Sequence, residues 1–387
     1  MTEQRPSDAD STAPAAERRR KASATRIGHR QAVSVLGLFL LWAGPRAAHA
    51  NKTDARWVVV PFPVYAPETD VQMTLTAMGH FRRADGAEPP SSLLANVAYT
   101  QRKQTSVSLA PHWVSRNGAV QALGKASFRD WPDKFYGVGH DTPERAEEDF
   151  SARTIGAFAT VRAAVFARWQ VGLRGEFSDA RVRQTEAGGQ LADGSIPGSE
   201  SARVAGLGLV ATWDSRDNLF HPERGVYAEL SATDFGSGLG DHAFRRVRLD
   251  ARQYFPVRPF GTLALQQHVN WLDGNVPFLE LSRIGDIRFG EINLMRGYYS
   301  GRFRDRHAAV LQSEWRFPLR GKIGATLFGG LGAIGANLLD TDERGVYPNG
   351  GVGFRYRARE SERVNLRLDI AFGERTSGVY FGILEAF

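Results

Sequence analysis

Residues 363–373, Arg-Val-Asn-Leu-Arg-Leu-Asp-Ile-Ala-Phe-Gly, alternate between apolar side chains and polar or small ones. A period of two places the even-numbered residues on one face of a β-strand and the odd-numbered residues on the other. The even-numbered face is wholly apolar, whereas the odd-numbered face carries Arg363, Arg367 and Asp369. A face with that much charge needs water beside it, so the stretch predicts a strand with water on one side.

The same alternation extends outward over most of the chain, for example in residues 351–358 and 246–252. The first strand is the weakest, because Pro61 and Pro63 remove backbone donors, and it is expected to be an edge strand or a plug segment. The 337 residues from 51 to 387 give about 21 per strand and connection, which suits membrane-spanning strands of roughly 9 to 11 residues with turns. We predict sixteen strands, near residues 57–67, 71–83, 92–102, 105–116, 118–130, 150–163, 165–180, 201–213, 225–235, 242–255, 260–272, 307–318, 322–332, 349–359, 362–373 and 377–387.

The composition excludes several classes of protein. The chain has 387 residues, of which 42% are hydrophobic, and it contains no cysteine, which rules out a disulfide framework and a thiolate metal site. Its formal net charge of +7 falls to +3 for residues 51–387, because residues 1–50 hold eight basic and four acidic side chains. So small a charge predicts no nucleic-acid partner.

Residues 1–50 have the order of a secretory signal peptide. A basic segment, residues 18–30, precedes the apolar run of residues 32–44, and Ala48-His49-Ala50 supplies a small-x-small cleavage site. The apolar run is shorter than the roughly 18 to 20 residues that a spanning helix needs. We therefore predict a signal peptide, residues 1–50, followed by an exported barrel, residues 51–387.

A soluble β-sandwich is the structural alternative, because alternation also fits one apolar face packed on another sheet. The export signal, the even number of strands and the strongly charged faces favour an all-β, transmembrane antiparallel barrel of sixteen strands. In a bilayer every backbone polar group must be paired internally, so such a sheet closes on itself. Short connections are expected at the periplasmic rim and long ones, such as residues 131–149, 181–200 and 273–306, at the outer rim.

Three segments carry more than strand pattern: the polar turn of residues 212–225, the segment Leu-Met-Arg-Gly-Tyr-Tyr at residues 294–299, and the terminal strand at residues 379–387. Together they resemble the bacterial surface antigen family, which includes the BamA- and TamA-type outer-membrane barrels. The resemblance covers nearly all of residues 57–387. The segment between residue 50 and the first strand is short, so we expect a member lacking periplasmic polypeptide-transport-associated domains.

The resemblance implies a sixteen-stranded barrel whose long outer loop, residues 273–306, folds inward. The triplet Arg296, Gly297 and Tyr298 would then lie in the lumen and hold the loop there, although a solvated loop arginine is the alternative. A buried arginine needs a carboxylate, and Glu314, on the inward face of the twelfth strand, is the first choice. Gly330 replaces the family's second lumenal carboxylate, and this departure either weakens the hold on the loop or shifts it to Glu314 and to Asp369.

The polar turn is expected to be structural, because Asx side chains bond local amides and glycine allows positive φ. Its characteristic residues are Asp214, Arg216, Asp217, Pro222 and Gly225. Phe387 has two interpretations. It is either an aromatic of the membrane girdle or the C-terminal insertion signal that, in this family, the barrel assembly machinery recognises.

The resemblance implies a non-enzymatic role in inserting or transporting proteins or lipids in the outer membrane of a Gram-negative bacterium. The expected partners are outer-membrane lipid and lipopolysaccharide, the barrel assembly machinery during biogenesis, and a second copy paired through a weak first-to-last strand seam. The alternatives are a passive pore and a barrel-borne hydrolase that uses His140 with Asp141 or His268 with Asp273. No cofactor is expected, because residues 330–335 match a dinucleotide fingerprint without the helix that must follow it.

Overall fold

The computed structural model describes residues 55–66, 69–81, 90–236, 238–285, 294–359 and 363–387, all within one compact unit, residues 53–387. The predicted signal peptide lies outside the described residues and stays a prediction. No helix in these ranges is long and apolar enough to cross a membrane.

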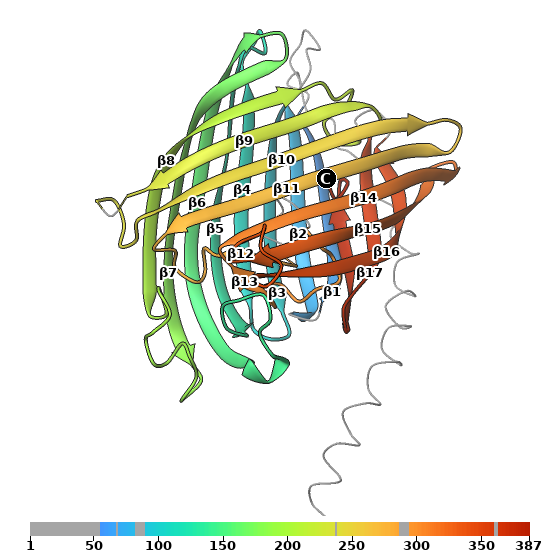
Figure 1. Ribbon diagram of the computed structural model, residues 1–387. Helices are drawn as coiled ribbons and strands as arrows, with labels where there is room; N and C mark the ends of the chain where they lie inside the picture. The colour runs from blue at the N-terminus through green and yellow to red at the C-terminus, as the bar shows by residue number, and fades with distance from the viewer. Residues whose placement is uncertain (1–54, 67–68, 82–89, 237, 286–293, 360–362) are drawn as a thin grey trace, which may run out of the picture. The chain divides into compact units, whose positions relative to one another are not determined.

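Sixteen antiparallel strands close into one barrel (Figure 1). Neighbours in sequence are neighbours in the barrel, except that β14 follows β11, because the short strands β12 (Ser282–Arg283) and β13 (Arg304–Asp305) form a sheet of their own. The predicted all-β, sixteen-stranded barrel is confirmed, and each predicted segment overlaps an observed strand. The barrel strands are β1 (Ala55–Ala66), β2 (Asp70–Phe81), β3 (Ser91–Thr100), β4 (Thr105–Val114), β5 (Val120–Phe135), β6 (Glu148–Phe166), β7 (Trp169–Thr185), β8 (Ser201–Asp214), β9 (Gly225–Phe235), β10 (Phe244–Val257), β11 (Gly261–Gly274), β14 (His307–Arg320), β15 (Ile323–Gly335), β16 (Arg344–Arg359), β17 (Val364–Gly373) and β18 (Thr376–Ile383).

The strands turn their apolar faces outward and their polar faces toward the lumen, as β14 illustrates. Its outward residues Leu311 and Trp315 are 51% and 41% exposed, whereas Gln312, Glu314 and Arg316 are buried. A soluble sandwich would bury the apolar face instead, so this distribution is that of a membrane barrel.

The two ends of the barrel differ in the length of their connections. At one end, consecutive strands are joined by connections as short as two or three residues, namely 167–168, 258–260 and 321–322. At the other end, the connections include residues 186–200 and 275–306. Outer-membrane barrels have short periplasmic turns and longer extracellular loops, so the end with long connections is the outer rim.

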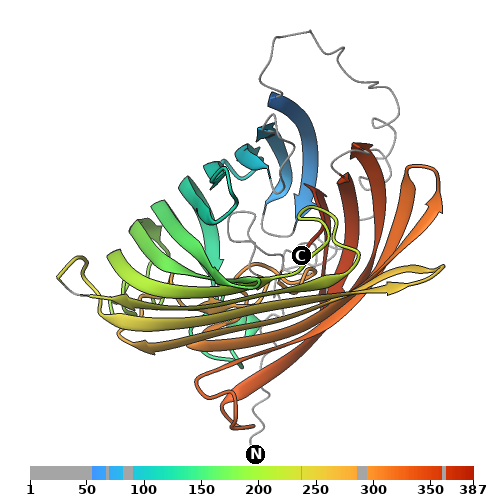
Figure 2. The same cartoon turned by 90° about the horizontal axis from the view of Figure 1, so that it is seen from above.

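The apolar core lies inside the barrel, beneath the connection of residues 275–306. The ring of Phe278 is fully buried and packs edge to face against Phe135 and Phe150, with centroids 5.4 and 5.5 Å away. A second apolar cluster joins Met295 and Tyr298 of the same connection to the inner wall of β14, β15 and β16. The described parts of the long connection, residues 275–285 and 294–306, therefore pack inside the barrel, and Figure 2 shows the ring of strands around them.

The seam between β1 and β18 is the weakest join in the described barrel. All twelve residues of β1 are in register with β2, but β1 and β18 share a single registered pair, Tyr65 and Val379. Every other neighbouring pair of barrel strands is joined at eight positions or more. The predicted first strand is thus part of the barrel wall and not a plug segment.

Candidate functional site

The inward loop reaches the barrel wall through a tight turn at residues 295–297. Met295 and Gly297 both have positive φ, +54° and +106°. A Cβ atom on Gly297 would lie 2.6 Å from the carbonyl carbon of Phe372, so glycine is required by both conformation and space. The Gly297 amide donates a hydrogen bond to the hydroxyl of Tyr380, 3.0 Å away. The loop backbone is therefore pressed against β17 and β18.

The turn directs Arg296 into a pocket of opposite charge. Its Nη2 atom donates to Glu314 Oε1 at 2.6 Å, its Nη1 atom donates to Asp369, and its guanidinium lies 3.7 Å from the centroid of the Phe328 ring. The carbonyl oxygen of Arg296 accepts a hydrogen bond from Asn349 at 2.8 Å. The structure thus brings Arg296 together with both carboxylates that the sequence singled out.

Tyr298, the last residue of the triplet, and Gly330, which departs from the family pattern, both lie at the inner wall near Arg296. Tyr298 is buried, and its hydroxyl donates to the carbonyl of Pro348 at 2.6 Å. Gly330 faces the lumen on β15, where a Cβ atom would lie 2.9 Å from Asn349 Oδ1. Asn349 therefore occupies the space that a carboxylate at position 330 would need.

Arg296 belongs to a larger lumenal network of arginines and carboxylates. The network pairs four arginines with three side-chain carboxylates, and its side chains are at most 8% exposed. Opposite charges must lie together there, because an uncompensated charge in a buried site is costly. The arginines are Arg296, Arg316, Arg355 and Arg367, and the side-chain carboxylates are Glu314, Asp369 and Glu385.

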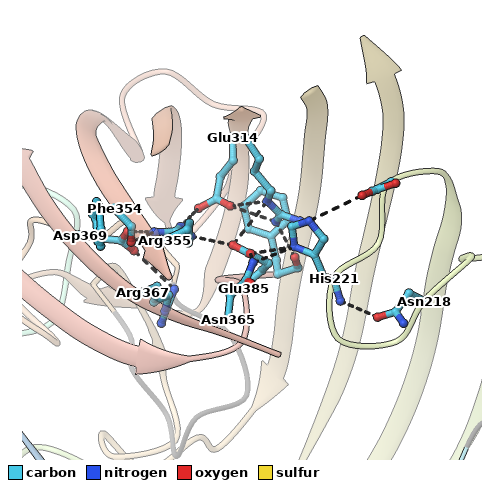
Figure 3. A network of polar contacts seen from close by, with 12 residues as sticks. Asn218, His221, Glu314, Phe354, Arg355, Asn365, Arg367, Asp369 and Glu385 are labelled. Atoms are coloured by element: carbon cyan, nitrogen blue, oxygen red, sulfur yellow. Dashed lines mark hydrogen bonds and ion pairs between the residues drawn. The ribbon is translucent and has the colours of Figure 1, made fainter. Parts of the chain in front are cut away.

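The last four residues leave the wall and enter this network. The predicted final strand, residues 377–387, was expected to continue to the C-terminus, but β18 ends at Ile383 and Leu384 has a positive φ of +72°. Glu385 accepts hydrogen bonds from Arg355 Nε at 2.8 Å and Asn365 Nδ2 at 2.7 Å (Figure 3). Burial alone would raise the pKa of Glu385, but Arg355 and Arg316 outweigh it and hold this pKa well below its usual range.

The interpretation of Phe387 as a girdle aromatic is wrong. Phe387 is buried in the lumen with Tyr254 and Ala264, and its terminal oxygen accepts a hydrogen bond from Arg316 at 2.7 Å. The chain leaves strand geometry at Leu384, whose φ is positive, and this turn carries Glu385 and Phe387 into the lumen.

The polar turn between β8 and β9 is built from local hydrogen bonds. Asp214 accepts from the backbone amide, Nε and Nη2 of Arg216, at 3.1, 3.0 and 2.7 Å, and Asp217 accepts the amides of residues 223 and 224. Gly225 has a φ of +108°. Pro222 lines the lumenal cavity. These are the contacts of a structural turn.

The same turn also crosses the periplasmic mouth, which its sequence did not predict. Asn218 accepts the amides of Phe220 and His221, each at 2.8 Å. The Phe220 ring then stacks on His80 of β2, with centroids 4.6 Å apart, while His221 Nδ1 lies 2.9 Å from Glu385. The turn therefore links the first strands to the C-terminal tail. The only sequence feature that could have indicated this contact is Glu385, a carboxylate two residues before the end of an otherwise apolar terminal segment.

The geometry does not support the pairing of His268 with Asp273 or the dinucleotide-like stretch. His268 is buried on the lumenal face of β11, whereas Asp273 is exposed on the opposite face, so the two do not form a pair. The dinucleotide-like residues 330–335 lie within β15. No group of three potential metal ligands occurs in the part of the chain that the structure describes.

Solved structures share this fold at low sequence identity. BamA from Haemophilus ducreyi lacking POTRA domains 1–3, CdiB from Acinetobacter baumannii and CdiB from Escherichia coli superpose with TM-scores of 0.54, 0.53 and 0.55, at 13%, 10% and 11% identity. The alignments cover 86%, 87% and 87% of this chain, but 69%, 60% and 62% of those chains. None of the curated proteins matches the sequence.

The family model for the Omp85 superfamily domain matches residues 91–387, which is more than half of the chain. The match confirms the resemblance to BamA-type barrels predicted from the polar turn, the Arg-Gly-Tyr loop and the terminal strand. The chain belongs to the Omp85 superfamily, whose barrels are of the outer-membrane type of Gram-negative bacteria.

Proposed function

We propose that this barrel inserts or transports proteins or lipids into or across the outer membrane, and that the seam between β1 and β18 is its working edge. The observation that carries the proposal is the single registered pair, Tyr65 with Val379, that joins these strands among the described residues. The proposed role is non-enzymatic, and it requires export by the signal peptide predicted in residues 1–50.

The geometry of the seam leaves part of β1 beyond the end of β18, although all of β1 is paired with β2 on its other side. Moving four residues from the registered pair along each antiparallel strand brings Pro61 opposite Ile383, the last residue of β18. Residues 55–60 of β1 lie beyond that point, because the tail turns into the lumen. A strand edge that extends past its neighbour is a template for an incoming strand, either of a client protein or of a second copy of this chain.

The inward loop would keep the lumen closed while the seam opens. In this proposal Arg296, Gly297 and Tyr298, with Glu314 and Asp369, form a lock that holds the long loop inside the barrel. Phe387 would serve as an insertion signal in the unfolded chain, where the barrel assembly machinery can read it before the tail is buried.

A disulfide across the seam tests the proposal, since the native chain has no cysteine. Tyr65→Cys with Val379→Cys would tether β1 to β18. Ile370→Cys with Val379→Cys is the matched control, because it tethers β17 to β18, which are already joined at eight positions. Each pair is introduced into cells depleted of the native protein, and outer-membrane proteins and lipids are then quantified.

Under oxidising conditions we expect the seam-tethered variant not to restore the normal protein and lipid composition of the outer membrane, and after reduction we expect it to do so. The control variant should restore this composition under both conditions. Full restoration by the oxidised seam tether, with the crosslink verified on a gel, would contradict the proposal. Depletion that changes neither proteins nor lipids would also contradict it.

A passive pore is the second candidate, because a cavity of about 390 Å³ follows the inner wall of the first strands. Hydroxyl and amide side chains line it, including Thr74, Asn96 and Ser108. Planar-bilayer recordings separate the two functions. A pore predicts large open-channel currents in the native protein, whereas the proposed lock predicts small currents that increase in Arg296→Ala. An unchanged conductance in that variant would count against a loop held by Arg296.

A further inference from the structure

We infer that the outer surface of β5 to β8 binds the phosphate groups of lipopolysaccharide. The site is a set of four outward-facing arginines, which we call the arginine row: Arg153, Arg181, Arg183 and Arg203. Adjacent residues in the same strands, Ala152, Ala180 and Ala202, are buried on the lumenal face, which fixes the outward direction of the arginines. This inference does not depend on the seam.

Strand register assembles the row from segments distant in sequence. Arg153 on β6 is paired with Asp130 on β5 and with Arg181 on β7. Arg203 on β8 is paired with Asp179 on β7. Four adjacent strands thus present their charges side by side on one surface.

Asp130 and Asp179 each lie against two arginines of the row. Asp130 accepts hydrogen bonds from Arg153 at 2.8 Å and Arg183 at 3.1 Å. Asp179 accepts two from Arg203, at 3.0 and 3.1 Å, and lies 3.5 Å from Arg181. A third carboxylate, Asp241, accepts the backbone amide of Arg203 at 3.1 Å, so the row as a whole keeps one positive charge in excess. The arginine side chains are 47% to 69% exposed. Guanidinium groups in this state present donors in the fork geometry that suits phosphate.

The row lies where the apolar outer surface ends. On β6, the next outward residue on the periplasmic side of Arg153 is Ile155. On β7, the next outward residue on the periplasmic side of Asp179 is Phe177. Both side chains are exposed. On β5, the ring of Phe128 lies 5.9 Å from the guanidinium of Arg153. Two residues of a strand span roughly 6.8 Å. One amphipathic molecule can therefore place its phosphate on the row and its acyl chains on the apolar residues below.

The position of the row identifies which lipid it meets. The arginines lie toward the ends of the strands that carry the long connections 136–147 and 186–200, which is the outer rim. Lipid with a phosphorylated headgroup in that leaflet is lipopolysaccharide. The nearest outward carboxylate beyond the row on β6, Asp149, is four residues further out, roughly 13 Å along the strand, so it does not compete for the phosphate.

Lipid binding by the purified full-length barrel in nanodiscs tests the inference. The variant combines Arg153→Ser, Arg183→Ser and Arg203→Ser. The matched control is Arg245→Ser on β10, since Arg245 is also exposed and outward but is paired with a single carboxylate, Asp234, 3.7 Å away. The probes are hexa-acylated lipid A, its dephosphorylated form and inorganic phosphate, and bound lipid is quantified by native mass spectrometry. Heat-modifiable gel migration verifies that each variant is folded.

We expect the triple variant to bind lipid A at least about tenfold more weakly than the native barrel and the control variant, because each surface arginine contributes to the attraction of anionic lipid. The native barrel should bind dephosphorylated lipid A as weakly as the variant does. Equal binding of lipid A by the folded triple variant and the native protein would overturn the inference. So would equal binding of the two lipid forms by the native barrel, or full displacement of lipid A by inorganic phosphate, which would indicate a general anion site.

Discussion

The barrel contains two arginine–carboxylate clusters with similar distances and opposite surroundings. Arg296 and Glu314 meet at 2.6 Å in the lumen, where their side chains are 2% and 0% exposed. Arg153 and Asp130 meet at 2.8 Å on the outer surface, where they are 47% and 28% exposed. Contact distance alone therefore does not distinguish them, and burial does.

Burial determines how much stability is lost when one partner of an ion pair is removed. Water screens an exposed pair, which typically contributes ~0–1 kcal/mol to stability. A buried pair has lost its hydration, so removal of one partner leaves an uncompensated charge and costs about 3–5 kcal/mol. This difference explains why every arginine of the lumenal network lies against at least one buried carboxylate, whereas the arginines of the row remain largely exposed to solvent.

The largest effect is expected for Glu314→Ala, because Glu314 accepts hydrogen bonds from both Arg296 and Arg316. Its removal leaves these arginines in a buried site with too few carboxylates, so the free energy of unfolding should fall by about 3–5 kcal/mol. Urea unfolding of the barrel in lipid vesicles, followed by tryptophan fluorescence, measures the change. If the free energy of unfolding fell by less than about 1 kcal/mol, the buried ion pairs would contribute no more to stability than the exposed ones.

Gly297→Ala tests whether placement of Arg296 matters as much as its charge. The added methyl group would lie 2.6 Å from backbone at Phe372 in a left-handed conformation, and we expect a loss of about 2–3 kcal/mol and faster proteolysis of the long loop. Gly321→Ala is the control, because Gly321 also has positive φ but has no atom within 4 Å of the added carbon. A control loss of about 1 kcal/mol is expected. Equal losses in the two variants would show that backbone strain alone is being measured.

A smaller and pH-dependent effect is expected for Glu385→Gln. The folded-state pKa of Glu385 is depressed, so its charge stabilises the fold above the unfolded pKa of about 4.3, and this contribution is lost as the pH falls through the folded value. The native barrel should therefore be more stable than the variant at pH 7, and the difference should shrink below about pH 4. Unfolding midpoints measured between pH 7 and pH 3 test this. A difference that is constant with pH would mean that the lost interaction is not ionic.

Alternation along most strands predicted the barrel and assigned Glu314 and Asp369 to its inner face, whereas the place of Arg296 beside them was expected from the resemblance to the surface antigen family. The sequence did not predict the tail or the turn that meets it. The contact between His221 and Glu385 joins residues 164 positions apart, and no local pattern encodes such a contact. The arginine row was missed because β7 runs five residues beyond the predicted end at residue 180. Outside the membrane both faces of a strand are polar, so periodicity fades there.

The smallest effect is expected for Asp130→Ala, which removes the carboxylate shared by Arg153 and Arg183. The geometry resembles that around Glu314, but water can solvate both arginines after the change, so the free energy of unfolding should move by less than about 1 kcal/mol. The net positive charge of the row increases, so binding of lipid A should stay equal or become tighter by roughly two- to threefold, and the gain should disappear in 1 M salt. Urea unfolding and lipid A titration of the same samples measure both quantities. A loss of stability as large as that of Glu314→Ala would show that burial does not separate the two clusters.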